Sequence, residues 1–257
     1  MPPLKAEQVA AWAEYQGAPW GRLRLDLLRA ILARHVPKPM RVLDVGCGFG
    51  ELAVEFARNG SQVVAADASA PMIAEAAARA ADAPVHWIAL EAERAAAHFA
   101  SQEFDLILCH NVLGYLSDPA GTCLGLASLL SNSGSLSITV VNRVAEPLRY
   151  AFLLRDLDAA LAAAEHDDPS RMAETLGVES RLESLDDAAG WLEASGLQLQ
   201  AAAGQLLVNH YLGATDKTKN TSEGYDAIFR LELALCERDP YRQVAPFLHL
   251  IARRPQS

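Results

Sequence analysis

Short apolar runs alternate with longer, helix-compatible segments through the middle of the chain. Five of these runs have the length and composition of strands buried on both faces, and they lie at residues 42–45, 63–66, 85–90, 104–109 and 135–141. Helices are predicted between them, from Glu51 to Arg58, from the N-cap Ser69 to about Ala80, and from Asp118-Pro119 to residues 131–134. Strands that alternate with helices of this length favour right-handed crossovers and a parallel sheet. The pattern therefore predicts an α/β fold with a Rossmann-like sheet.

The flanking parts of the chain follow a different pattern. Residues 6–36 are predicted to form two helices, separated by a stretch in which Gly17, Pro19 and Gly21 act as breakers, with the second helix running from Leu23 to His35. Residues 145–196 are expected to be mainly helical, with breaks at Pro169 and Gly177. The remaining expected elements are a helix at 184–195, a strand at 197–211, a helix at 222–238 and a strand at 247–253.

The stretch Arg41 to Glu51, RVLDVGCGFGE, joins the first predicted strand to the first predicted helix of the sheet. Gly46, Gly48 and Gly50 stand at alternate positions, and a turn without side chains lets the backbone approach a ligand closely. The second apolar run ends at Asp67, 17 residues after Gly50. A carboxylate at this place is positioned to accept hydrogen bonds from both hydroxyls of a ribose.

The spacing of the glycines separates two classes of cofactor. Dinucleotide-binding folds carry G-x-G-x-x-G, in which a helix N-terminus faces a pyrophosphate. Here the spacing is G-x-G-x-G after Asp44, which resembles the first motif of class I S-adenosylmethionine (SAM) methyltransferases; an NAD-binding fold with a degenerate fingerprint is the alternative. The resemblance implies that the turn cradles the amino-acid part of SAM and that Asp67 binds its ribose. The expected cofactor-binding residues are Asp44, Gly46, Cys47, Gly48, Gly50, Asp67, Ala68, Met72, Ala92, Glu93, His110 and Tyr115.

A wider resemblance connects the chain with one branch of that family, the bacterial tRNA 5-carboxymethoxyuridine methyltransferases. It rests on RVLDVGCGFGE, FDLILCHNVLGYLSDP, AAGWLEASGLQL and the C-terminal run that starts at Tyr225. The resemblance implies a seven-stranded sheet that ends in an antiparallel hairpin. It also implies an N-terminal helical cap at 1–36, a SAM-binding Rossmann-like core at 37–144, a helical lid insertion at 145–183 and the C-terminal part of the core at 184–257.

Four residues are candidates for catalysis or acceptor binding, namely Arg24, Tyr15, His110 and His210. Arg24 matches a basic residue of the cap that, in the resembling enzymes, helps to hold the carboxylate being methylated. Tyr15 belongs to the aromatic surface of this cap. A hydroxyl or amide acceptor needs a base, and histidine is the natural base near neutral pH. His110 and His210 both lie at the ends of predicted strands; the structural alternatives are a strand-end hydrogen bond for His110 and packing for His210.

Charge and composition narrow the range of partners. The formal net charge is −10, and residues 145–195 carry 12 acidic against 4 basic side chains, so the chain lacks the broad basic face of a polynucleotide binder. Leu206 and Asn209 also stand where the resembling tRNA enzymes carry Arg and His. No apolar run reaches the length of a membrane span, the N-terminus has no signal-peptide core, and the cysteines show no disulfide or metal spacing. We therefore expect a cytoplasmic protein without membrane or metal partners.

The sequence thus predicts a SAM-dependent methyltransferase that acts on an oxygen or nitrogen nucleophile of a small molecule or modified peptide. The first alternative is methylation of the carboxyl group of 5-carboxymethoxyuridine at the wobble position of tRNA. The second alternative is a protein that binds SAM or S-adenosylhomocysteine (SAH) without turnover. The sequence gives no indication of an oligomeric state.

Overall fold

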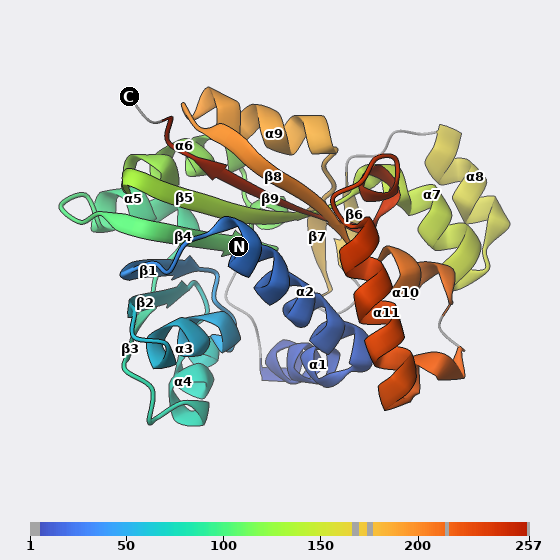
Figure 1. Ribbon diagram of the computed structural model, residues 1–257, viewed down its shortest axis with the longest axis horizontal. Helices are drawn as coiled ribbons and strands as arrows, with labels where there is room; N and C mark the ends of the chain where they lie inside the picture. Colours follow the sequence, from blue (N-terminus) through green and yellow to red (C-terminus); the bar gives the residue numbers. More distant parts are fainter. Residues whose placement is uncertain (1–5, 166–169, 174–176, 214–215, 256–257) are drawn as a thin grey trace.

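The computed structural model describes residues 6–165, 170–173, 177–213 and 216–255. Its centre is a seven-stranded sheet with the strand order β3-β2-β1-β4-β5-β9-β8 (Figure 1). The strands are β1 (Arg41–Val45), β2 (Gln62–Asp67), β3 (Val85–Ala89), β4 (Phe104–His110), β5 (Leu130–Val141), β8 (Gln198–Gln205) and β9 (Phe247–Arg253). Strands β1 to β5 are parallel, and β9 runs antiparallel to both of its neighbours. The expected Rossmann-like sheet with a final antiparallel hairpin is confirmed.

The strand order reverses at β1. The chain moves from β1 outward to β2 and β3, and then returns to β4 on the other side of β1. Ligands of open α/β sheets bind at such a reversal, outside the carboxyl ends of the strands. The glycine turn after β1 and His110 at the end of β4 therefore lie at the same edge of the sheet.

Helices cover both faces of the sheet (Figure 1). One face carries α5 (Ala95–His98), α6 (Pro119–Ser128) and α9 (Leu185–Ala194); the other carries α2 (Pro19–His35), α3 (Glu51–Arg58) and α4 (Ala70–Arg79), with α11 (Ser222–Leu235) beside α2. In β1, Leu43 and Val45 pack toward the first group, whereas Val42 packs toward the second. Because successive side chains of a strand point to opposite faces, β1 contributes apolar side chains to the core on both sides of the sheet.

The remaining helices extend beyond the carboxyl ends of the strands. Helix α1 (Ala6–Gly17) packs Val9, Trp12 and Ala13 against Phe49 and Met72, next to the glycine turn. The insertion after β5 contains α7 (Glu146–Leu148), the π-helix η4 (Arg149–Leu154) and α8 (Leu157–Glu165). The other short helices are η1 (Ala92–Arg94), η2 (Leu113–Tyr115), η3 (Arg143–Ala145), α10 (Leu207–Tyr211), η5 (Lys217–Asn220) and η6 (Tyr241–Val244). Within the described ranges, no helix combines the length and apolar character that crossing a membrane requires.

Several element boundaries differ from the sequence predictions, among them the end of α11 at Leu235 instead of residue 238. Helix α2 begins at Pro19 rather than Leu23, because proline fits the first turn of a helix, where its missing N–H is not needed. Helix α6 ends at Ser128, and residues 131–134 belong to β5 instead of the helix end. The cause is strand pairing, since Phe104 at the start of β4 pairs with Leu130.

The insertion was expected to be mainly helical, and its second half is not. Strands β6 (Ser170–Ala173) and β7 (Val178–Arg181) pair with each other as an antiparallel, two-stranded sheet. Gly177 precedes β7 in a left-handed conformation with φ of +60°, which suits a hairpin connection. Backbone hydrogen bonds between the strands therefore override the helical tendency of this part of the sequence.

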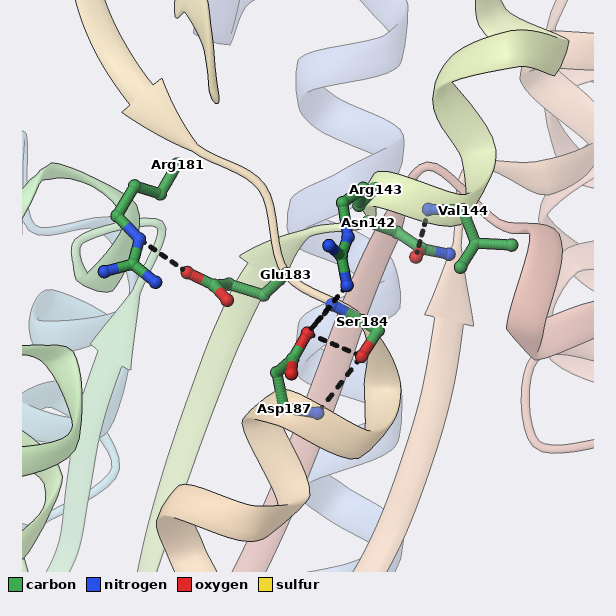
Figure 2. A network of polar contacts seen from close by, with 7 residues as sticks. All are labelled: Asn142, Arg143, Val144, Arg181, Glu183, Ser184 and Asp187. Atoms are coloured by element: carbon green, nitrogen blue, oxygen red, sulfur yellow. Dashed lines mark hydrogen bonds and ion pairs between the residues drawn. The ribbon is translucent and has the colours of Figure 1, made fainter. Parts of the chain in front are cut away.

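A polar network joins the insertion to the sheet (Figure 2). The backbone N–H of Glu183 donates to the carbonyl of Val141 at the end of β5, over 3.0 Å. Arg143 pairs with Asp187 over 3.1 Å, and Asp187 forms a capping box with Ser184 at the start of α9. Hydrogen bonds from Ser184 lower the pKa of Asp187. The prediction that Ser184 caps this helix is confirmed.

Strand β8 ends at Gln205, earlier than the sequence predicted. Leu206 then adopts a left-handed conformation with φ of +64°, and α10 follows. The backbone N–H groups of Leu207 and Asn209 both donate to the buried carboxylate of Glu232, over 3.1 Å each. This carboxylate satisfies donors that the first turn of a helix leaves free. His210 consequently lies on a short helix and not at a strand end.

Candidate active site

The glycine turn after β1 keeps the carboxyl edge of the sheet open. Gly46 has a φ of +71°, and a Cβ on it would lie 2.1 Å from Cγ2 of Val112. Gly48 has a φ of +58°, and a Cβ on it would face the indole Nε1 of Trp12 at 3.4 Å. A Cβ on Gly50 would lie 2.3 Å from the ring of Trp87. Of these three glycines, only Gly46 and Gly48 border a pocket.

Asp67 lies at the end of β2 and faces the same turn. One carboxylate oxygen accepts a hydrogen bond from the N–H of Gly48 over 3.1 Å, and the other accepts one from the N–H of Ser69 over 2.8 Å. Burial raises the pKa of Asp67, and these two hydrogen bonds oppose the shift. Each oxygen keeps a further lone pair for a ligand hydroxyl.

The edge above β1 and β4 holds a pocket of about 90 Å³, here called the cofactor pocket. Its lining is Trp12, Gly46, Gly48, Asp67, Ala68, Met72, Leu90, Ala92, Glu93, His110, Asn111, Val112, Tyr115 and Leu116. Most of the predicted cofactor-binding residues are thus brought together, and their roles stay predictions. Asp44, Cys47 and Gly50 are outside this lining. Sequence reasoning missed Leu90, Val112 and Leu116, because apolar residues after strands carry no signal that separates a pocket wall from core.

Asp44 lies in β1, buried beneath this pocket. The residue is 5% exposed, and neither a hydrogen bond nor an opposite charge is among the influences on the pKa of its carboxyl group. Burial raises its pKa to about 7, and the charges of Glu51 and Asp67 add to the shift. A buried carboxylate without a partner is costly. The ammonium group of a ligand such as SAM would supply a partner for this carboxylate, and Gly48 leaves the adjoining space open, so the residues present fit that cofactor.

A larger cavity of about 490 Å³ adjoins the cofactor pocket and is here called the acceptor cavity. Aromatic and aliphatic side chains from several elements form most of its wall: Trp12, Tyr15, Pro19, Trp20, Tyr115, Val140, Val141, Leu153, Leu154, Leu206, Pro246 and Phe247. Its charged lining residues are Arg149, Arg181, Asp216 and Lys219. Trp12, Asn111 and Tyr115 border both spaces. The two pockets therefore meet at these three side chains.

Of the four catalytic candidates, Tyr15 and His210 line the acceptor cavity, and His110 lines the cofactor pocket. His110 Nε2 lies 2.9 Å from Ser137 Oγ, which in turn lies 2.8 Å from Nε2 of His249. Burial is the main cause that lowers the pKa of both imidazoles, to about 3 for His249. Both rings are therefore neutral near pH 7. The contact with Ser137 is the strand-end hydrogen bond that the sequence suggests as the structural alternative for His110.

Arg24, the fourth candidate, is buried in α2 and enclosed by aromatic rings. Its guanidinium carbon lies 5.7 Å from the ring centre of Trp12 and 5.9 Å from those of Tyr15 and Phe247. One terminal nitrogen donates to the side chain of Gln16 over 3.4 Å, and Nε has no partner among the described residues. Arg24 therefore stands directly behind three residues of the acceptor cavity wall.

Leu206 and Asn209 stand where the resembling tRNA enzymes carry Arg and His, and both make structural contacts here. Leu206 is buried at the start of α10, and Asn209 is buried within it. The ammonium group of Lys219 donates to the carbonyl oxygen of Asn209. Burial is the first cause that raises the pKa of the nearby Glu232 to about 7. Lys219 and Glu232 together hold α10 in place, and α10 carries His210 to the cavity.

Comparisons with known proteins agree with this geometry. Residues 42–134 match the family described as a methyltransferase domain. The chain is 30% identical over 251 residues to the tRNA 5-carboxymethoxyuridine methyltransferase of Escherichia coli, covering 94% of this chain and 92% of that protein. It is 32% identical over 181 residues to the ubiquinone biosynthesis O-methyltransferase of Xanthomonas axonopodis pv. citri, covering 70% and 71% of the two chains. The crystal structure of magnesium protoporphyrin IX methyltransferase from Synechocystis with bound SAH has a similar fold, with a TM-score of 0.63, 16% identity and coverage of 97% and 95%.

The antiparallel final strand and the glycine turn agree with these comparisons. The chain belongs to the class I SAM-dependent methyltransferases. This membership confirms SAM as the cofactor and decides against the NAD-binding alternative. It also supports an enzyme and argues against the alternative of a protein that binds SAM without turnover.

Proposed function

We propose that the protein transfers the methyl group of SAM to an oxygen or nitrogen of a small, largely apolar molecule or modified peptide. The observation that carries this proposal is the acceptor cavity of about 490 Å³, which opens onto the cofactor pocket at Trp12, Asn111 and Tyr115. Pockets of this size and lining are typical of small-molecule sites.

Each part of the site has a task in this reaction. SAM supplies an electrophilic methyl group on a sulfonium. Asp67 binds hydroxyls, Asp44 receives an ammonium group, and Ala92 and Glu93 border the pocket where the adenine is expected. Methyl transfer is an in-line displacement, so the enzyme mainly has to align the two reactants and exclude water. Trp12 and Tyr15, whose rings stack 5.2 Å apart, close the junction from the side of the cap.

Proton removal depends on the acceptor. A carboxylate or amine needs no strong base, whereas a hydroxyl or amide does. His210 lines the acceptor cavity and His110 the cofactor pocket. Burial lowers the pKa of His110, which keeps the ring neutral near pH 7 and also weakens it as a base. In the tautomer whose Nε2–H donates to Ser137, Nδ1 is the ring nitrogen that can accept a proton. We assign the base to His110 and the positioning of the acceptor to His210 and Tyr15.

The experiment has two steps. Titration calorimetry with SAM tests cofactor binding, and incubation with SAM and extracts fractionated by size then tests turnover. The expected result is a product heavier by one methylene unit in the small-molecule fraction, detected by mass spectrometry and absent when Asp67→Ala replaces the wild-type protein. A protein that binds SAM and methylates only the polymer fraction would overturn the proposal.

A second candidate function is methylation of 5-carboxymethoxyuridine in tRNA. It is favoured by the identity of 30% that extends over nearly all of both chains, and by the place of Arg24 behind the acceptor cavity. Against it stand the net charge of −10 and the absence of Arg and His at Leu206 and Asn209. Binding to a polynucleotide depends on several Lys or Arg contacts that release counterions.

The two candidates differ in their response to salt. Tight binding to tRNA that weakens steeply with added salt, together with methyl transfer to the modified uridine, would promote the second candidate. In that case Arg24→Ala should abolish transfer while SAM affinity stays close to that of the wild type. Weak binding at low salt alone fits the small-molecule function, because the cap carries Arg22, Arg29 and Arg34.

A further inference from the structure

The residue after His110 has an unusual backbone. Asn111 directly follows β4 with a φ of +55°, one of three non-glycine residues in the described ranges with a positive φ. Asparagine tolerates this left-handed conformation better than most residues, yet such positions remain uncommon and often occur at ligand sites. Asn111 also borders both the cofactor pocket and the acceptor cavity. A residue with an uncommon backbone conformation thus stands at the junction of the two pockets.

Thr139 of β5 fixes the side chain of Asn111. The backbone N–H of Asn111 donates to Thr139, over 2.9 Å to its hydroxyl and 3.1 Å to its carbonyl oxygen. The hydroxyl of Thr139 donates its single proton to Oδ1 of Asn111 over 3.0 Å. These contacts use the carbonyl end of the side-chain amide. Its two Nδ2–H donors have no partner among the described residues.

We propose that Nδ2 of Asn111 donates a hydrogen bond to the acceptor molecule, next to the atom that receives the methyl group. Acceptors then carry an oxygen that accepts hydrogen bonds, such as a carbonyl, carboxylate or phenolic oxygen, at or beside the methylated position. The inference rests on the proposed function, since it requires that the acceptor cavity holds the acceptor. Asn111 is then a residue that determines specificity, and Thr139 positions it.

A structural role alone would need only the left-handed backbone of Asn111. Glycine adopts that conformation without strain, so Asn111→Gly keeps the turn and removes the donor. Asn111→Asp keeps both shape and backbone but presents an acceptor in place of the donor. These two variants separate the hydrogen bond from the geometry of the turn. SAH affinity and melting temperature serve as controls for the fold.

The test uses two probes of similar shape, 2-acetylnaphthalene and 2-isopropenylnaphthalene, which differ in one carbonyl oxygen. Their affinities for the full-length protein saturated with SAH are measured by calorimetry, and the ketone-to-hydrocarbon affinity ratio is compared between variants. We expect this ratio to fall about three- to tenfold in Asn111→Gly, as for the loss of one neutral hydrogen bond, and further in Asn111→Asp. Thr139→Val should give a smaller fall, because the amide is present but no longer fixed.

The outcomes separate this inference from the proposed function. If both probes bind and the ratio is unchanged in Asn111→Gly, the acceptor cavity stands and the inference is wrong. If neither probe binds the wild-type protein, the apolar acceptor cavity fails as a ligand site, and the inference falls with it. A lowered ratio with unchanged SAH affinity supports both.

Discussion

The backbone N–H of Gly48 donates a hydrogen bond to the carboxylate of Asp67 over 3.1 Å. This contact links the turn after β1 to the acid at the end of β2, which are far apart in the sequence. It sets the carboxylate at the wall of the cofactor pocket, where its remaining lone pairs are available to a ribose.

Replacing Asp67 with alanine should weaken SAM binding by roughly 1.5–3 kcal/mol, the range for hydrogen bonds that involve a charged group. Titration calorimetry measures the change directly. Asp82→Ala is the matched control, because Asp82 is an exposed acid whose salt bridge with Arg58 lies outside the pocket. Equal SAM affinity in the two variants would remove Asp67 from the cofactor site.

A Cβ at position 48 should interfere with SAM as well as with the turn. Gly48→Ala places a methyl group beneath Trp12, in space that the cofactor needs, and strains a left-handed backbone by about 1–2 kcal/mol. Gly60→Ala is the control, since Gly60 also has a positive φ but nothing lies within 4 Å of the added Cβ. Both variants should lose stability in a thermal melt, and only Gly48→Ala should lose SAM affinity. Loss of affinity in both would point to the fold instead.

SAM affinity should depend on pH through Asp44. Burial raises the pKa of Asp44 to about 7 in the free protein, and the ammonium group of SAM favours the ionised form. Affinity should therefore rise with pH by up to about tenfold per unit below pH 7, and level off above it. Calorimetry from about pH 5.5 to about pH 7.5 measures the slope, and a proton should be released on binding at the lower end.

Asp44→Asn tests the origin of that slope, because the amide cannot ionise. The variant should bind SAM with little dependence on pH over the same range. The difference in the free energy of unfolding between this variant and the wild type should also change with pH. A raised pKa in the folded state means that the wild type holds the proton more tightly when folded, so its Asp44 contribution to stability is full below about pH 4 and is lost as pH rises through about 7. A slope for SAM that persists in Asp44→Asn would assign it to another group.

The insertion should exchange amide hydrogens faster than the sheet in the free protein. Helix α8 buries only Ala160 among its nine residues, while Leu157 and Leu161 are 72% and 58% exposed. Segments with so few buried contacts open at low free-energy cost. Arg149, Leu153 and Leu154 line the acceptor cavity, so exchange across 146–165 should slow when an acceptor binds. Exchange equal to that of β1 in both states would show that this segment is core.

Most of the parallel sheet could be predicted because its strands are buried on both faces. The apolar runs ending at Val45 and Asp67 do not alternate between apolar and polar residues, as a strand with one exposed face would. Strands β1, β2 and β9 have the predicted bounds or differ from them by one residue at an end. The start of a helix could also be predicted where a nearby side chain caps it. Ser69 does so by accepting a hydrogen bond from the N–H of Met72.

The elements that sequence reasoning missed depend on distant contacts. Helix α10 begins after a leucine in a left-handed conformation and is held by Glu232, which lies 25 residues after Leu207. The hairpin of β6 and β7 had a local signal in Gly177, which was interpreted as a helix break. In the site, the glycine turn and Asp67 were predictable from spacing. The pairing of Asn111 with Thr139 was not, because only the adjacency of β4 and β5 brings them together.

The shared wall of the two pockets has a consequence for inhibitors. Because the cofactor pocket and the acceptor cavity meet at Trp12, Asn111 and Tyr115, one molecule can occupy both. Joining an adenosine-containing group to an apolar group through a short spacer makes the second binding event intramolecular, so the combined affinity exceeds that of either part. The cofactor half of such a compound would bind many methyltransferases, whereas the half in the acceptor cavity would make it selective for this one.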